Sequence, residues 1–198
     1  MAVDKNQLYP IFLKLSQLNV LIVGGGYVGF EKLSFMLKSS PEARVTLLSK
    51  EFSESVKQLA EAHQIPMIQR AYTSNILHKK HLVIAATDDV SVNKQIYHDA
   101  KARNILVNVA DTPAYCDFYL GGVVTKGNLK LAISTNGKSP TFTKRLRQFF
   151  EETLPEDLDD LIENLHQYRA TLQGELSEKT EILNKHTALL IKENHDQN

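Results

Sequence analysis

The first 111 residues alternate short apolar runs with segments that repeat apolar residues at helical spacing. The run from Leu82 to Ala86 is typical of a parallel strand covered on both faces, because such strands read as continuous hydrophobic stretches. Alternation of strand and helix favours a parallel, doubly wound α/β sheet, and residues 9–15 are expected to pack on its edge. The expected strands span 20–23, 44–49, 66–69, 81–89 and 105–111, and the expected helices follow the first strand up to residue 37 and span 53–63 and 91–103.

The pattern changes after residue 113. Residues 118–135 read as two strands joined near Lys126 and Gly127, which predicts a β-hairpin rather than another strand-helix-strand unit. A helix should begin after Ser139, since serine is a favoured N-cap and Pro140 suits the first helical position. Two further helical patterns follow, over 156–172 and 175–191. The expected domains are 1–113 for the sheet, 114–150 for the hairpin and helix, and 151–198 for a small C-terminal helical domain.

A glycine-rich turn joins the first strand to the first helix. Gly24, Gly26 and Gly29 supply the G-x-G-x-x-G pattern of Rossmann-type dinucleotide-binding folds, in the strand-turn-helix context that the pattern needs. One glycine makes the tight turn, one lets the backbone approach a pyrophosphate, and one lets the helix lie close to the strand. The helix N-terminus then offers unpaired N–H groups to phosphate. The alternative is a glycine-rich turn that binds nothing, and the flanking strand and helix favour cofactor binding.

Polar residues at the ends of two other strands extend this expected cofactor site. In NAD-binding Rossmann folds an acidic residue about 20 positions beyond the glycines binds the ribose hydroxyls. Here that strand end carries Ser49, Lys50 and Glu51. Glu51 favours NAD, whereas Lys50 could meet the 2′-phosphate of NADP. Thr87 and Asp88 follow another strand, at the edge where open α/β sheets bind ligands.

Composition and charge limit the class of protein. Of 198 residues, 42% are hydrophobic and 23% charged, and no run of 18 apolar residues or apolar N-terminal signal occurs, so we expect a cytoplasmic protein without membrane contact. The single cysteine, Cys116, excludes an intrachain disulfide. Residues 1–150 hold 19 Lys and Arg against 11 Asp and Glu, and residues 151–198 hold 4 against 12. The basic part suits an anionic ligand, and a solvated tail that balances charge is the alternative.

Asp111 is the candidate catalytic residue. It stands at the carboxyl end of the last apolar strand, where the ligand cleft of such a sheet opens. A carboxylate there could accept a proton as hydride leaves for nicotinamide, or steer a cation. The alternative is an aspartate that merely starts the Asp-Thr-Pro turn, because aspartate and proline both favour turns. The residue pattern alone leaves both explanations open.

His78 and His81 invite a metal-site interpretation. Two lysines separate them, and HKKH lies at a loop-to-strand junction without nearby cysteine or carboxylate partners. A structural Zn²⁺ site normally needs four ligands, so a surface turn is the better explanation and no metal site is expected. The KRLR run at 144–147 lacks a stacking aromatic platform, so no nucleic-acid partner is expected either.

Four motifs, in their order and spacing, make the chain resemble precorrin-2 dehydrogenase, the N-terminal module of siroheme synthase. They are GGGYVGFEK, AATDD, NVADTPAYCDF and LAISTNGKSP, and the resemblance covers about residues 8–155. It implies NAD-dependent oxidation of precorrin-2 to sirohydrochlorin, sometimes followed by Fe²⁺ insertion to give siroheme. It also implies a homodimer with interlocking hairpin and helical regions, and a tetrapyrrole held between the Rossmann sheet and those regions. The methyltransferase module of the full synthase would need a much longer chain and is not expected here.

The resemblance also implies roles for single residues. Asp111 falls on the family's catalytic aspartate, and Tyr27, Val28, Lys50 and Glu51 fall on its NAD-contacting positions. Precorrin-2 carries many carboxylates, so its site should be electropositive, although a solvated helix face is the alternative for each basic residue. The expected substrate residues are Ser134, Thr135, Lys138, Lys144 and Arg145.

Two alternatives stay open at this point. Some members of the family carry a serine that can be phosphorylated where this chain has Thr135, so a modification of Thr135 or Ser134 is undecided. A non-catalytic NAD-sensing module is the rival function from another class. Such a module would need the glycines to bind dinucleotide but would not need Asp111.

Overall fold

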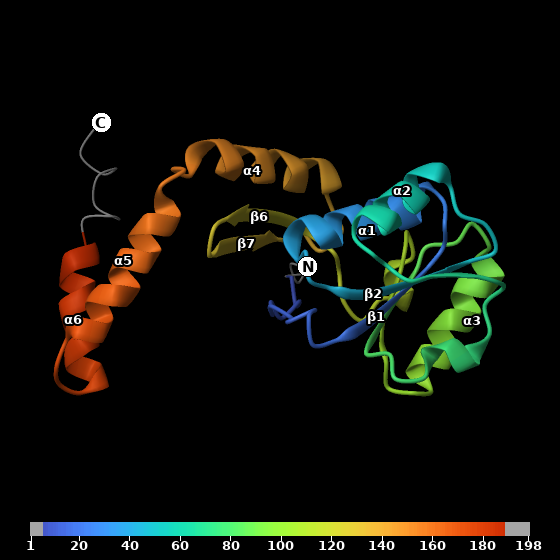
Figure 1. Cartoon of the computed structure of the whole chain (residues 1–198), viewed down its shortest axis with the longest axis horizontal. Helices are drawn as coiled ribbons and strands as arrows, with labels where there is room; N and C mark the ends of the chain where they lie inside the picture. Colours follow the sequence, from blue (N-terminus) through green and yellow to red (C-terminus); the bar gives the residue numbers. More distant parts are fainter. Residues whose placement is uncertain (1–5, 189–198) are drawn as a thin grey trace, which may run out of the picture. The chain divides into compact units, whose positions relative to one another are not determined.

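The computed structural model of the chain describes residues 6–188 (Figure 1). These residues belong to two compact units. The first unit contains the described residues up to Val123 together with Ala132–Leu146, and the second contains Val124–Leu131 and the described residues from Arg147 onward. The expected domain division stays a prediction, because a compact unit need not coincide with a domain.

A parallel sheet of five strands organises the first unit, in the order β3-β2-β1-β4-β5. All four neighbouring pairs are parallel, with Val20 of β1 opposite Val45 on one side and Leu82 on the other. The chain reverses its direction of travel across the sheet between β1 and β4, which creates the switch point where such sheets bind ligands. The strands are β1 (Asn19–Val23), β2 (Arg44–Ser49), β3 (Met67–Gln69), β4 (Leu82–Ala85) and β5 (Leu106–Val109).

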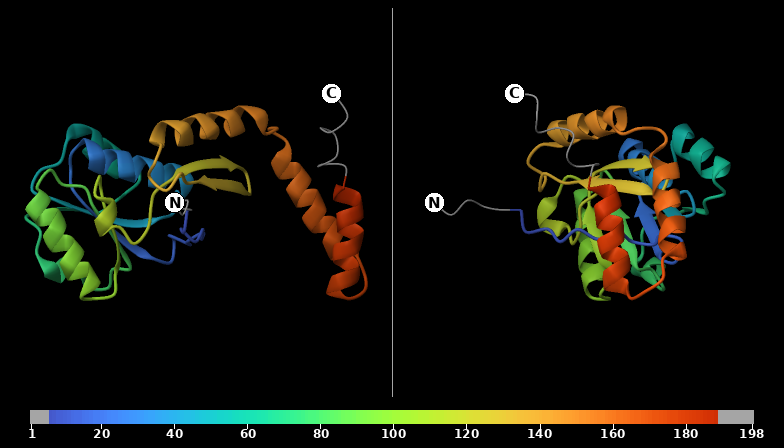
Figure 2. Two further views of the ribbon diagram at one scale, coloured as in Figure 1. Left: turned by 180° about the vertical axis from the view of Figure 1, so that it is seen from behind. Right: turned by 90° about the vertical axis from the view of Figure 1, so that its left-hand side faces the viewer.

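Helices cover both faces of this sheet. Alternate residues of β1 face opposite sides, so Ile22 joins the cluster that buries Leu33 and Val56, whereas Leu21 joins the cluster that buries Ile96. One face is therefore covered by α1 (Tyr27–Ser39) and α2 (Glu54–Ala62), and the other by α3 (Val90–Lys101) (Figure 1 and Figure 2). The doubly wound fold expected from the sequence is confirmed.

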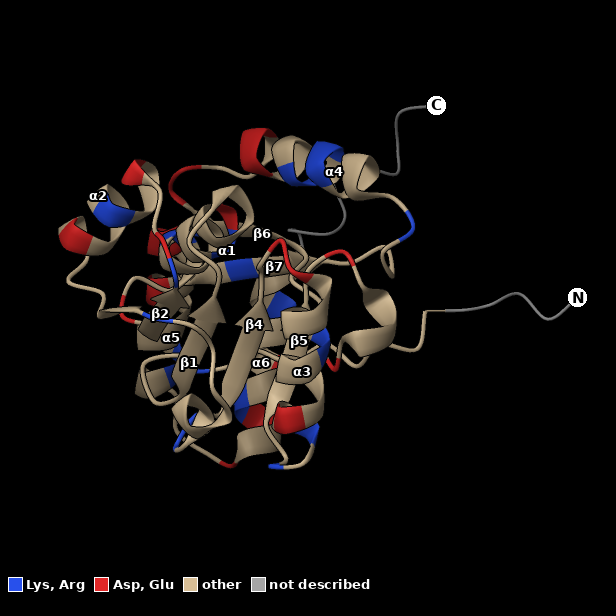
Figure 3. Ribbon diagram, turned by 90° about the vertical axis from the view of Figure 1, so that its right-hand side faces the viewer, with Lys and Arg blue, Asp and Glu red and all other residues tan. Residues whose placement is uncertain are grey.

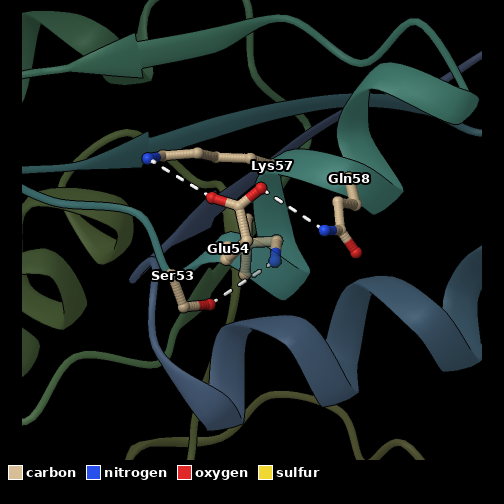
Figure 4. A network of polar contacts seen from close by, with 5 residues as sticks. Ser53, Glu54, Lys57 and Gln58 are labelled. Atoms are coloured by element: carbon tan, nitrogen blue, oxygen red, sulfur yellow. Dashed lines mark hydrogen bonds and ion pairs between the residues drawn. The ribbon is translucent and has the colours of Figure 1, made fainter.

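The N-terminus of α2 is fixed beside the glycine-rich turn. The Ser53 hydroxyl accepts a hydrogen bond from the Val56 N–H at 3.4 Å, and Glu54 pairs with Lys57 in the same turn (Figure 4). The Ser53 N–H donates to the Gly25 carbonyl at 2.8 Å. The start of α2 and the turn after β1 therefore hold each other in one arrangement.

The hairpin and the helix after it form as expected. The hairpin consists of β6 (Gly122–Lys126) and β7 (Leu129–Ile133), with Gly127 at a φ of +50° in the turn. The Ser139 hydroxyl accepts a hydrogen bond from the Phe142 N–H at 3.2 Å, which confirms Ser139 as the N-cap of α4 (Pro140–Thr153). Two short 3₁₀ helices complete the first unit, η1 (Ser74–Leu77) and η2 (Pro113–Tyr115).

In the second unit, α5 (Leu158–Thr171) holds the turn of the hairpin. Asp159 Oδ1 accepts hydrogen bonds from the Asn128 N–H at 2.6 Å and the Asn128 side-chain amide at 2.9 Å, and Lys126 pairs with Glu156. The last helix is α6 (Leu176–Thr187), and the expected helical positions 189–191 lie outside the described residues. Within the described part of the chain, no residue of α4, α5 or α6 is buried.

The segment before β1 departs from the expectation. Tyr9 is 86% exposed and Phe12 is 68% exposed, so their side chains do not pack on the sheet edge. Leu15 does pack against the core, and its carbonyl accepts a hydrogen bond from the Arg44 N–H at 3.1 Å. Residues 9–14 form no strand in the described structure, so no strand pairing holds their apolar side chains against the sheet.

Candidate functional site

The predicted cofactor residues and Asp111 lie at one edge of the sheet. Carboxyl ends of neighbouring parallel strands lie at the same edge, and open α/β sheets bind ligands there. The glycine turn follows β1, and Asp111 follows β5 after Ala110. Ser49 ends β2, with Lys50 and Glu51 behind it, and Thr87 and Asp88 come shortly after the end of β4.

Two glycines of the turn permit close packing, and a third leaves open space. A Cβ on Gly24 would lie 2.2 Å from the Ala86 carbonyl oxygen, and the φ of Gly24 is +131°. A Cβ on Gly29 would lie 2.2 Å from the Gly24 carbonyl oxygen, so this glycine lets α1 approach the turn. A Cβ on Gly26 would meet nothing within 4 Å. The space beside Gly26 fits the task predicted for it, close approach of backbone to a pyrophosphate.

The N-terminus of α1 is suited to an anion. Gly26 is its N-cap and makes no side-chain capping bond, and the first turn has no acidic residue. The first intrahelical bond joins the Phe30 N–H to the Gly26 carbonyl at 3.0 Å. The N–H groups of Tyr27, Val28 and Gly29 precede that bond and have no intrahelical acceptor. Together with the helix dipole, they fit a pyrophosphate without a basic side chain.

Gly25 is a further residue of the site that the G-x-G-x-x-G pattern did not identify. A Cβ on Gly25 would lie 2.1 Å from the Glu51 carbonyl oxygen and 2.9 Å from the Ser49 Cβ. Gly25 therefore lets the turn lie against the end of β2, which carries the predicted ribose-binding residues. The only indication in the sequence was a glycine at a position that the pattern leaves free.

A buried asparagine holds the end of β4, and the sequence patterns had not identified it as a site residue. Asn93 of α3 is 9% exposed, and its Oδ1 accepts hydrogen bonds from the Thr87 hydroxyl at 2.7 Å and the Thr87 N–H at 3.3 Å. Its amide donates to the Thr87 carbonyl at 2.9 Å. Asn93 thus fixes the backbone of Thr87 on both sides, whereas Asp88 is exposed. Asn93 precedes Ile96 by three residues and Ala100 by seven, so helical periodicity could have predicted that it lies on the buried face of α3.

The charge of Lys50 acts on the residue that caps α3. Asp89 accepts hydrogen bonds from the Ser91 hydroxyl at 2.6 Å and the Val92 N–H at 3.2 Å. These bonds, chiefly the one from Ser91, hold the pKa of the Asp89 carboxyl below its usual range, and the Lys50 charge adds to the effect. The Lys50 charge is the smallest of these contributions, and no ion pair joins Lys50 to Asp89 among residues 6–188.

Asp111 lies in the turn that follows β5. Its side chain is exposed, and no hydrogen bond or ion pair engages its carboxylate among the residues that the structure describes. Its φ is +57°, a left-handed conformation that costs ordinary residues about 1–2 kcal/mol and that Asp and Asn adopt more readily. Such backbone outliers cluster at functional sites, where the surroundings impose them. Asp111 is both a turn residue and an exposed carboxylate at the ligand-binding edge.

The expected substrate residues lie on another segment, the loop after β7 and the first turns of α4. The Thr135 hydroxyl accepts a hydrogen bond from the Ser139 N–H at 3.1 Å and contacts the Thr143 hydroxyl at 3.2 Å, and Ser134 Oγ accepts from the Asn136 N–H. Thr135 therefore supports the start of α4. Lys and Arg residues occur along α4, where the ribbon is coloured blue (Figure 3). The expected Lys138, Lys144 and Arg145 are exposed, and their role with a substrate stays a prediction.

The two histidines of HKKH lie away from this site. His81 Nδ1 accepts a hydrogen bond from the Asn19 N–H at 2.8 Å, which ties the start of β1 to the start of β4 at the opposite edge of the sheet. Among residues 6–188, no three His, Cys, Asp or Glu side chains gather closely enough to hold a metal ion. No helix within the same residues has the length and apolar character to cross a membrane.

Two protein families match the sequence. The family described as "Putative NAD(P)-binding" matches residues 11–122, and the family "Sirohaem biosynthesis protein central" matches residues 126–153. The first match contains the glycine turn, the ends of β2 and β4, and Asp111. The second contains the turn of the hairpin and α4.

Curated relatives and a solved structure extend the comparison. A siroheme synthase of Pseudoalteromonas atlantica is 35% identical over 88% of this chain, and one of Nitrosococcus oceani is 33% identical over 86%. The chain spans 37% and 36% of these two proteins. The solved structure "SirC, precorrin-2 dehydrogenase" is 25% identical, with a TM-score of 0.74 over 90% of this chain and 88% of that one.

Proposed function

The chain belongs to the putative NAD(P)-binding family matched over residues 11–122, and on that premise we propose that it oxidises precorrin-2 to sirohydrochlorin with NAD. The SirC precorrin-2 dehydrogenase, which is similar over 90% of the chain, supports this substrate. The siroheme synthases support the same pathway, although the chain corresponds to just over a third of each. The proposal therefore concerns the dehydrogenase reaction.

The observation that carries the proposal is the exposed Asp111 carboxylate at the sheet edge that holds the glycine turn. Oxidation of precorrin-2 removes one hydrogen as hydride and one as a proton. NAD, held at the glycine turn, would supply the hydride acceptor. We assign the proton to the Asp111 carboxylate, because β5 pairs with β4 and the segments that follow these two strands carry Asp111 and Thr87 at the same edge of the sheet.

We propose NAD rather than NADP as the cofactor. Lys50 is the side chain at the end of β2 that could meet a 2′-phosphate. Glu51, exposed beside it, suits ribose hydroxyls and would repel a phosphate.

The test is a wild-type assay under anaerobic conditions with precorrin-2 and either NAD or NADP. We expect NADH and sirohydrochlorin to form in equal amounts, with a higher kcat/KM for NAD than for NADP. Binding of NAD without any NADH formation would instead support the NAD-sensing module.

Adding Fe²⁺ to the finished reaction tests iron insertion, for which the exposed Asp111 carboxylate is a candidate guide to the cation. Siroheme formation no faster than the spontaneous rate would exclude that second activity.

We further propose that the chain forms a homodimer, as its resemblance to precorrin-2 dehydrogenase implies. Supporting this, α5 carries the apolar residues Leu158, Leu161, Ile162 and Leu165, all of which are only partly buried within the described chain. Partly buried apolar stripes gain stability when a partner covers them. Sedimentation equilibrium should give twice the chain mass of 22.3 kDa. A monomer mass at all concentrations would contradict the dimer. A cytoplasmic location stays a prediction.

A further inference from the structure

We propose that Cys116 and Asn108 are positioning residues that hold the Asp111 turn in its left-handed conformation. This inference rests on the proposed function, because it assigns them an effect on turnover through Asp111. They belong to the segment that leaves β5, makes the Asp111 turn and η2, and returns beside β5.

The Cys116 thiol contacts the backbone on both sides of Asp111. Its Sγ accepts a hydrogen bond from the Val109 N–H at 3.4 Å, and its S–H lies within reach of the Val109 carbonyl at 3.3 Å and the Thr112 carbonyl at 3.4 Å. Val109 stands two residues before Asp111 and Thr112 one residue after it. A single side chain therefore spans the turn, which the Thr112 N–H closes with a hydrogen bond to the Val109 carbonyl at 3.2 Å.

Asn108 fastens the returning chain to the strand. It is 7% exposed, and its amide donates to the Phe118 carbonyl at 2.8 Å and contacts Cys116 Sγ at 3.4 Å. A buried amide rarely lacks partners, and here both of its contacts lie on the returning segment. Asn108 thus fixes the position from which the thiol reaches the turn.

A second set of contacts closes the base of the loop. The Asp117 N–H donates to the Val107 carbonyl at 2.8 Å, and its carboxylate accepts from the Val107 N–H at 3.1 Å and from Lys101 at 2.6 Å. Tyr115 stacks on Tyr97 of α3 with ring centroids 4.6 Å apart. The loop ends are held by these groups independently of the thiol, so removing the thiol should alter the turn without releasing the loop.

The thiol suits a neutral hydrogen-bonding role rather than a nucleophilic one. It is partly buried, and this burial raises the pKa of the Cys116 thiol. A protonated thiol can donate and accept at once, as the contacts to Val109 and Thr112 require. Serine can make the same kinds of contact and alanine cannot, which gives a conservative variant and a disruptive one at the same position.

The experiment compares Cys116→Ala with Cys116→Ser in single-turnover hydride transfer from precorrin-2 to NAD. For Cys116→Ala we expect a rate about 10- to 100-fold below wild type, because a misplacement of about 1 Å can cost on the order of 100-fold. NAD affinity should stay unchanged, and Cys116→Ser should recover most of the rate. Tyr72→Phe is the matched control, since it removes the hydrogen bond from Tyr72 to Asp99 at 3.1 Å and should lower Tm without slowing hydride transfer.

A double-mutant cycle with Asp111→Asn tests whether Cys116 acts through Asp111. In the Asp111→Asn background, Cys116→Ala should cause no further loss of rate, because the group it positions is already gone. A full additional loss there, or a wild-type rate for Cys116→Ala alone, would overturn the proposal. A wild-type protein that never oxidises precorrin-2 would instead overturn the proposed function.

Reversible modification gives a second route if Cys116→Ala does not fold. Cys116 is the single cysteine of the chain, so methylthiolation at alkaline pH, where the thiol ionises despite its raised pKa, reaches one residue and removes its S–H donor. We expect the rate of hydride transfer to fall and to return when dithiothreitol removes the group. An unchanged rate in the fully modified protein would refute the positioning role.

Discussion

Replacing Asp111 by asparagine should slow precorrin-2 oxidation by about two to four orders of magnitude and leave the protein folded and able to bind NAD. Asparagine has the same shape and adopts the left-handed conformation at φ +57° as readily as aspartate, so the turn should persist. The variant loses the proton-accepting carboxylate, and general-base catalysis is worth about 10²- to 10⁴-fold. We therefore expect kcat to fall by that factor, measured as NADH formation at saturating NAD and precorrin-2.

NAD binding and Tm of the Asp111→Asn variant separate a catalytic role from a structural one. Both should match wild type, because the carboxylate has no partner among the described residues. Asp111→Ala is the less informative variant, since alanine in a left-handed turn adds backbone strain of about 1–2 kcal/mol to the loss of the carboxylate. NADH production by Asp111→Asn at the wild-type rate would show that another group accepts the proton.

The sequence predicted those features of the fold that depend on residues close to one another in the chain. The five strands follow from apolar runs, and the start of α4 follows from Ser139, whose capping bond involves residues three positions apart. The family and the NAD(P)-binding fold were likewise predicted and are confirmed by the match over residues 11–122 and by the sheet order. The roles of the individual site residues stay predictions.

Contacts between distant segments account for what the sequence did not predict. The task of Gly25 depends on the Glu51 backbone, 26 positions away, and the left-handed Asp111 depends on a thiol that returns from η2. The exposure of Tyr9 shows the same limit, because an apolar run before a strand does not specify whether a neighbour covers it. Hydrophobic periodicity predicts which residues of an element face the core, whereas the conformation of Asp111 and the surroundings of Gly25 and Tyr9 depend on which other segments of the chain contact them.

Alanine at Gly24 and at Gly26 should produce opposite kinds of defect. Gly24→Ala places a Cβ 2.2 Å from the Ala86 carbonyl oxygen at a φ of +131°, so the turn and the end of β4 must move apart. We expect a loss of about 1–3 kcal/mol in the free energy of unfolding from the backbone strain alone, and with it a loss of NAD binding. Thermal unfolding and NAD titration measure the two effects.

Gly26→Ala is the matched control for Gly24→Ala and the sharper test of the cofactor site. Its Cβ would meet nothing within 4 Å, so Tm should fall only slightly, by the equivalent of the roughly 0.5–1 kcal/mol that alanine costs as a poorer N-cap than glycine. The added methyl would occupy the space assigned to the pyrophosphate, and a loss of about 1.4–2.8 kcal/mol there weakens NAD binding roughly 10- to 100-fold. Wild-type NAD affinity in a Gly26→Ala protein would mean that the pyrophosphate lies elsewhere, because the methyl group has no other neighbour through which to act.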